Sequence, residues 1–188
     1  TANSAHADHH IIIHHPDYDA SSNKKVYFGN DGGIQMTNNV LAVAQNSGWV
    51  NLCNTTLGIT QFYGGAAAPD GSVIVGGTQD NDHLRYKSSG TWSGKASWYQ
   101  AETGDGGFAA IDYNSPDTIF AEYVYLSIEL SINGGNLYGS ATFGLTDAGD
   151  DTKALFIAPF SMDPNNPQRL IAGGTSIWRT NVSAVSWH

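Results

Sequence analysis

The sequence predicts an all-β fold, a β-propeller of about four blades in which each blade is a four-stranded antiparallel sheet. Two observations lead to this prediction: a composition suited to short strands, and a repeat of roughly 48 residues. Of the 188 residues, 22 are glycine, 11% are aromatic and only 13% are charged. Short strands joined by tight turns fit this composition better than long surface helices do.

The repeat is visible in four segments, each with an apolar run, a proline beside Asp or Asn, and a second apolar run. The anchoring residues are Pro16, Pro69, Pro116 and Pro164. Their spacing of roughly 47 to 53 residues fits propeller blades and is too long for leucine-rich or ankyrin units. Because proline presets φ and Asp or Asn bonds its own backbone, each segment predicts two strands joined by a turn.

The remaining strands of each blade follow from the rest of the repeat. A third strand is predicted at 34–37, 84–87, 128–132 and 177–180, where apolar and polar residues generally alternate. We expect a single propeller domain, or a fragment of one, over residues 1–188. Its repeats span approximately 6–59, 60–106, 107–153 and 154–188.

A large aromatic residue follows the third run of each repeat, namely Trp49, Trp98, Phe143 and Trp187. Stacked sheets need bulky side chains to fill the wedge between them. We therefore expect these residues to pack between neighbouring blades and not to serve as sugar platforms.

The charge balance excludes one class of partner. The formal net charge is −9, and the eight Lys and Arg residues are scattered, so the chain should repel the phosphates of nucleic acid. Apolar runs are far shorter than the roughly 20 residues that a membrane crossing requires, so we expect no membrane insertion.

Five stretches, in order, carry a family resemblance: HADHHIIIHHP, VYFGNDGGIQMT, TQFYGGAAAP, VGGTQDN and TGDGGFAAID. Together they resemble the Asp-box (bacterial neuraminidase repeat) propellers of the sortilin-like and xyloglucanase-like glycosyl hydrolase superfamily. The nearest copy of the Asp-box is SINGG from Ser131, with Asn133 where the box has Asp. In that family the box closes a hairpin on the outer rim, so it marks architecture and not activity.

The resemblance also implies a setting for the chain. Related propellers are larger and secreted, which implies an extracellular or periplasmic location. Because four open blades would expose strand edges, we expect either the remaining blades of a larger propeller or self-association.

The first candidate site is the stretch HADHH near the start of the chain. Side chains alternate along a strand, so His6, Asp8 and His10 should share one face. Two imidazoles and a carboxylate suit a divalent metal ion such as Zn²⁺. The three residues span roughly 13 Å of strand, however, so a hydrogen-bonded lining of the central channel is the alternative. No cofactor is required by any other feature of the sequence.

The second candidate site consists of polar loops at the ends of the inner strands. Glycoside hydrolysis typically uses two carboxyl groups, and Asp80 and Asp105 occupy corresponding loops on either side of the second blade. Asp8 and Asp31 are the reserve pair. Ligand-binding side chains are expected from Asp8, Asp31, Gln79 and Asn81. The alternative is that these carboxylates cap turns through backbone N–H groups.

The class of ligand is inferred from the types of side chain that the chain offers for binding. Sialidases of propeller form grip the substrate carboxylate with several arginines, and this chain has only Arg85, Arg169 and Arg179. Aromatic and amide side chains suit a neutral polysaccharide better. The sequence predicts a glycan-binding or glycoside-hydrolase-like propeller, and the alternative is a non-catalytic, sortilin-like module that binds a peptide or protein. Whether the chain is an enzyme stays open at this point.

Overall fold

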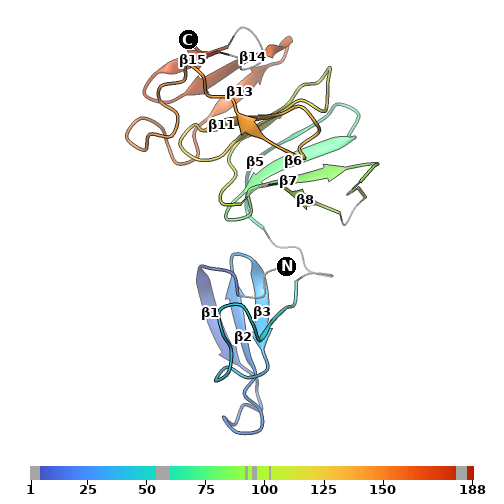
Figure 1. Cartoon of the computed structure of the whole chain (residues 1–188), viewed down its shortest axis with the longest axis vertical. Coiled ribbons are helices and arrows are strands. Elements are labelled where there is room, and N and C mark those ends of the chain that lie inside the picture. The colour runs from blue at the N-terminus through green and yellow to red at the C-terminus, as the bar shows by residue number, and fades with distance from the viewer. Residues whose placement is uncertain (1–4, 54–59, 92, 95–96, 102, 181–185) are drawn as a thin grey trace. The chain divides into compact units, whose positions relative to one another are not determined.

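A computed structural model of the chain describes residues 5–53, 60–91, 93–94, 97–101, 103–180 and 186–188. Figure 1 shows that the described chain consists of β-strands and loops. The strands form four antiparallel sheets, which confirms the prediction of an all-β propeller of about four blades. Over the same residues, no helix has the length and apolar character needed to cross a membrane.

Each sheet is built from consecutive strands in sequence order. Blade 1 contains β1 (His9–His14), β2 (Val26–Asn30), β3 (Gly33–Thr37) and β4 (Trp49–Asn51). Blade 2 contains β5 (Phe62–Ala67), β6 (Val73–Thr78), β7 (His83–Lys87) and β8 (Tyr99–Gln100). Blade 3 contains β9 (Ala109–Ile111), β10 (Ile119–Glu122), β11 (Ile128–Ser131) and β12 (Gly139–Ser140). Blade 4 contains β13 (Phe160–Asp163), β14 (Asn166–Gly173) and β15 (Ile177–Arg179).

Blade 4 differs from the predicted four-stranded sheet, because its described part has three strands. Where a fourth strand was expected, a single antiparallel bridge joins Thr180 to Trp187. In the part of the chain that the structure describes, the expected pairing of a fourth strand is therefore reduced to one bridge pair.

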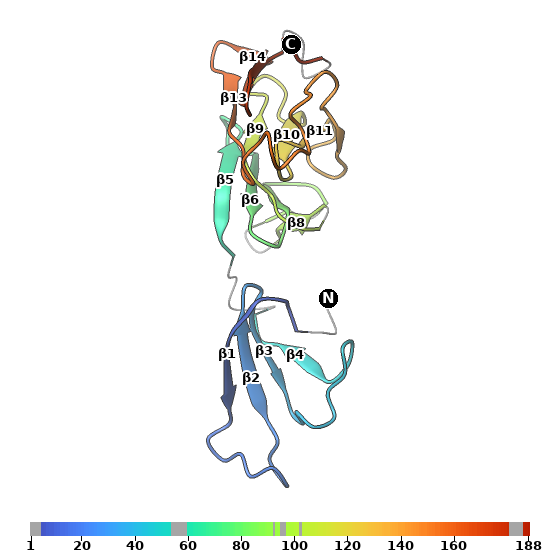
Figure 2. The same cartoon turned by 90° about the vertical axis from the view of Figure 1, so that its left-hand side faces the viewer.

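The chain divides into two compact units, Thr1–Gln61 and Phe62–His188. Unit 1 holds blade 1, and unit 2 holds blades 2, 3 and 4. Within unit 2 the first strands of successive blades are neighbours, since β5 contacts β9 and β9 contacts β13 (Figure 2). Neighbouring first strands are what the radial arrangement of a propeller requires.

The apolar core of unit 2 lies between its blades. One cluster joins blades 2 and 3, and a larger one joins blades 3 and 4. Because blade 3 is covered on both faces, all four residues of β10 are buried. In β14 the alternation is kept instead: Leu170 and Ala172 are buried against blade 3, whereas Ile171 between them is 51% exposed. Blade 4 therefore has one covered and one open face.

The expectation of an aromatic wedge in every blade is only partly met. Trp187 is buried in the cluster between blades 3 and 4, as expected. Phe143, expected to do the same for blade 3, is 78% exposed, so that expectation is wrong. The reason is local, because its carbonyl oxygen accepts a hydrogen bond from the backbone of Trp187, whose side chain fills the space. Trp49 packs within its own blade, edge-on to Phe28.

Side chains close the connection between β11 and β12. The Ser131 hydroxyl accepts a hydrogen bond from the amide of Gly135 at 2.9 Å. The Asn133 carbonyl oxygen Oδ1 accepts from the amides of Asn136 and Leu137, both at 3.1 Å. Two amides of this tight turn thus depend on the Asn133 side chain.

We expect Asn133→Ala to lower the free energy of unfolding of unit 2 by about 1 kcal/mol, because both amides lose their protein acceptor but remain open to water. Urea denaturation followed by circular dichroism measures the loss. Asn133→Asp keeps an acceptor oxygen and should unfold like the wild type. Equal stability of the Ala and Asp variants would contradict the role given to Oδ1.

Candidate functional site

The candidate site of unit 2 lies on a rim, which we define as three segments: the β6–β7 turn (79–82), the segment before β9 (104–107) and the β10–β11 turn (123–127). The amide of Asp82 donates to the carbonyl of Gly104 at 2.7 Å, and the amide of Gly106 donates to that of Thr78 at 2.9 Å. The turn of blade 2 therefore pairs directly with the segment that leads into blade 3.

The same arrangement recurs one blade later. The amide of Tyr125 in the β10–β11 turn donates to the carbonyl of Phe156, which lies on the segment leading into blade 4. The rim is consequently a repeated feature of the fold, and its turns are held by their neighbours.

Glycines make this close pairing possible. A Cβ on Gly77 would overlap the carbonyl oxygen of Gly107, and one on Gly106 would lie 2.5 Å from the carbonyl oxygen of Asp82. Gly104 has a φ of 107°, a backbone conformation that favours glycine. Gly77 and Gly106 are needed for backbone contact and not for a positive φ.

Asp80 and Asp105, the predicted catalytic pair, are brought together on this rim. The backbone amide of Asp80 donates a hydrogen bond to Oδ1 of Asp105 at 3.1 Å. Asp80 has a φ of 60°, a conformation that is uncommon outside glycine. The carboxylate of Asp105 thus caps a turn, which is the role that the alternative reading assigned to it.

Gln79 and Asn81, predicted to bind ligand, flank Asp80 in the same turn. The Asn81 side-chain amide donates to the carbonyl of Gln79 at 3.0 Å. Both side chains are half-buried. The rim therefore combines two carboxyl groups with two side-chain amides, a set that can donate to and accept from hydroxyl groups.

Glu122, which sequence reasoning missed, lies fully buried beneath the rim at the end of β10. Its carboxyl group accepts three backbone hydrogen bonds: from Ala158 at 2.7 Å, and from Phe108 and Leu126 at 3.2 Å each. Burial raises the pKa of Glu122 to about 7, although the three amides and nearby His83 act in the opposite direction. The carboxyl group joins blade 3 to the segment leading into blade 4.

Beside Glu122 lies His83, the first residue of β7, which extends the cluster of buried polar side chains towards blade 2. Its Nδ1 lies 3.3 Å from Oδ1 of Asp82, and its Nε2 lies 3.4 Å from the carbonyl oxygen of Phe108. All three polar side chains of the group, Asp82, His83 and Glu122, are buried. The only sequence signal for them was an acidic residue closing the apolar run IFAE at Glu122.

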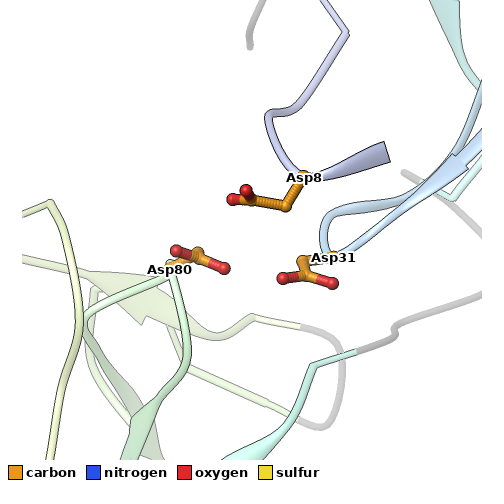
Figure 3. A group of neighbouring side chains, drawn as sticks. All are labelled: Asp8, Asp31 and Asp80. Atoms are coloured by element: carbon orange, nitrogen blue, oxygen red, sulfur yellow. The ribbon is translucent and has the colours of Figure 1, made fainter. Parts of the chain in front are cut away.

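In unit 1 the structure rearranges the predicted metal-binding set. Nε2 of His10 is bonded to Oδ1 of Asp31 in the β2–β3 turn, and this bond and charge raise the pKa of His10. The carboxylates of Asp8 and Asp31 come within 4.8 Å of each other. His6 lies apart, with its ring over Gly32. Figure 3 shows Asp8 just before β1 and Asp31 in its turn; Asp80 in the same picture belongs to unit 2.

Asp31 therefore bonds His10 and lies near Asp8, and no bond joins the two carboxylates in the described residues. A metal ion held by His6, Asp8 and His10 stays a prediction.

We expect Asp31→Asn to lower the pKa of His10 towards its ordinary value of 6.5, since the raised pKa comes chiefly from this carboxylate. Because the pKa is raised in the folded state, the pair stabilises unit 1 below pH 6.5 and is lost as the pH rises through the raised value. An NMR titration of the imidazole protons measures the shift. Asp17→Asn, near His15, is the control and should leave His10 unchanged.

Comparison with known proteins gives fold-level matches alone. No family model matches the sequence, and no curated protein matches it. Among solved structures, an ancestral GH74 enzyme aligns with a TM-score of 0.50 at 13% identity, over 96% of this chain and 25% of that one. The GH74 enzyme of Niastella koreensis aligns with a TM-score of 0.49 at 15% identity, over 94% of this chain and 30% of that one.

The WD40 repeats of RRP9 align with a TM-score of 0.47 at 12% identity, over 100% of this chain and 52% of that one. The likeness to the ancestral GH74 enzyme supports the propeller fold. This chain spans between a quarter and a third of the length of the two GH74 chains.

Proposed function

We propose that this chain is the glycan-recognising part of a propeller that binds or cleaves a neutral polysaccharide, with the ligand on the rim of unit 2. The observation that carries the proposal is the hydrogen bond that joins Asp80 to Asp105 on adjacent segments of that rim. Two carboxyl groups beside side-chain amides supply both the acceptors and the donors that sugar hydroxyls need.

A neutral ligand is favoured because the arginines are engaged elsewhere. Arg85 is buried between blades 2 and 3, where it donates to Asn136 at 2.7 Å and lies 4.9 Å above the Tyr99 ring. Arg169 lies 3.8 Å from Asp163, and Arg179 contacts His188. None of these contacts involves the rim, so an acidic sugar would meet carboxylates there without a compensating arginine.

Cleavage would need one carboxyl group as acid and the other as base or nucleophile. The hydrogen bond that Asp105 accepts from the amide of Asp80 orients its carboxyl group on the rim, and we assign Asp105 the role of base or nucleophile. Asp80 is then the acid. The fold likeness to GH74 enzymes makes hydrolysis the reaction to test first, and an extracellular or periplasmic location belongs to the same proposal.

The test measures binding and release of reducing sugar from a panel of neutral polysaccharides. If the chain cleaves, Asp80→Asn and Asp105→Asn should each lower kcat/KM by about 100-fold or more. Asp117→Asn is the control, since Asp117 pairs with Lys87 away from the rim. Binding without cleavage would leave a binding module. Retention of peptides or secreted proteins, with no glycan bound, would favour an interaction module instead.

The open face of blade 4 belongs to the same proposal. Ile177 and Ile171 lie exposed on a face whose counterpart in blade 3 is covered. We infer that a further blade, from a larger propeller or from self-association, covers this face.

A further inference from the structure

One aromatic side chain on the rim lies outside the apolar core. Tyr123 is the first residue after β10 and is 42% exposed. Its backbone amide donates to the carbonyl of Ser127 at 3.0 Å, so its position in the β10–β11 turn is fixed. An aromatic side chain on a held backbone has only two χ angles to order when it binds a ligand, so the cost in conformational entropy is low.

The ring of Tyr123 lies against the segment that carries Asp105. A Cβ on Gly104 would sit 2.9 Å from Cε2 of the ring and 3.3 Å from its hydroxyl oxygen. Gly104 itself is held by the amide of Asp82, which donates to its carbonyl at 2.7 Å. Glycine at this position therefore leaves room for the ring, and the contact places an apolar surface against the residue that precedes Asp105.

Among the other exposed aromatic side chains in the described part of unit 2, Phe156 packs against Tyr125 of the rim, with 5.5 Å between ring centres. Phe62 and Trp98 lie near each other, 6.5 Å between ring centres, on the face of blade 2. Phe143 lies beside the backbone of Trp187. None of these contacts includes a carboxylate of the rim, whereas Tyr123 contacts the residue before Asp105.

We propose that Tyr123 is the stacking platform of the rim, which receives the apolar face of a pyranose while Asp105 and the amides of Gln79 and Asn81 bond its hydroxyls. This inference rests on the proposed function and names the ligand class more narrowly. A β-linked, gluco-configured pyranose directs its C–H bonds to the two ring faces and its hydroxyls to the edge. Such a sugar matches a flat aromatic ring bordered by polar groups.

The test is binding of the whole chain to a soluble β-glucan and to its oligosaccharides, measured by calorimetry. Tyr123→Ala should weaken binding about tenfold or more, because one stacked ring is lost. Tyr123→Phe keeps the ring and should bind within about twofold of the wild type. Phe143→Ala is the matched control, an exposed aromatic off the rim, and should bind like the wild type.

The outcomes separate the two proposals. If the wild type binds and Tyr123→Ala binds equally well, the platform is wrong and the glycan function stands. If the wild type binds no glycan, the proposed function fails. Should Tyr123→Ala melt at a different temperature from the wild type, Tyr123→Leu replaces it, since leucine keeps apolar bulk without a ring. Equal loss of binding in Tyr123→Phe would also overturn the platform.

Discussion

Glu122→Ala is expected to lower the free energy of unfolding of unit 2 by more than about 3 kcal/mol. The substitution removes the acceptor of three backbone amides, those of Phe108, Leu126 and Ala158. Each buried donor left without a partner costs about 1–3 kcal/mol. Urea denaturation at pH 7, followed by circular dichroism, measures the loss. A variant as stable as the wild type would contradict the joining role of this carboxyl group.

The raised pKa of Glu122 adds a pH dependence to this expectation. Between pH 4.5 and about 7 the folded state holds a proton that the unfolded chain has released. The stability of the wild type should therefore fall as the pH rises through this window, by about 3 kcal/mol from this group. Glu122→Gln cannot ionise and should lose that slope. A slope that persists unchanged in Glu122→Gln would contradict the assignment of this pH dependence to Glu122.

Gly77→Ala is the second substitution with a large expected effect. The added methyl group would overlap the carbonyl oxygen of Gly107 and lie 2.5 Å from the carbonyl carbon of Gly106. Both neighbours are backbone atoms of the paired segment, so neither can relieve the overlap by a change of rotamer as a side chain could. We expect a loss of at least about 2 kcal/mol and a displacement of the rim, hence weaker glycan binding as well.

Gly139→Ala is the control for this experiment. Nothing lies within 4 Å of a Cβ at Gly139. Thermal unfolding should therefore change by less than about 0.5 kcal/mol in the control and by several times that amount in Gly77→Ala. Equal effects at both positions would show that the pairing of the rim tolerates a side chain.

The strands were predictable because their signals are local. The third strands begin at Gly33, His83, Ile128 and Ile177, within one residue of the predicted starts. Alternation and turn chemistry act over a few residues, so they can be read from the sequence. The exposure of the Phe143 side chain could not be read from the sequence, because this exposure depends on Trp187 filling the space between blades 3 and 4. The period alone does not say which aromatic residue fills a wedge.

The candidate site was predictable only where equivalent loops carried equivalent residues. Asp80 and Asp105 were paired by their places in the repeat, and a hydrogen bond joins them in the structure. Glu122 was missed because its amide partner at Ala158 is 36 residues away in the chain. Tyr123 was missed because its contact with Gly104 is likewise a product of blade packing.

The central claim, that the rim of unit 2 binds a neutral polysaccharide, is tested most directly by NMR. Titration of the isotope-labelled chain with a neutral β-linked oligosaccharide should shift the amide signals of Gln79, Asp80, Gly104, Asp105 and Tyr123, and leave the strands of blade 4 unchanged. Shifts confined to blade 4, or to the His10 and Asp31 end of unit 1, would contradict the claim.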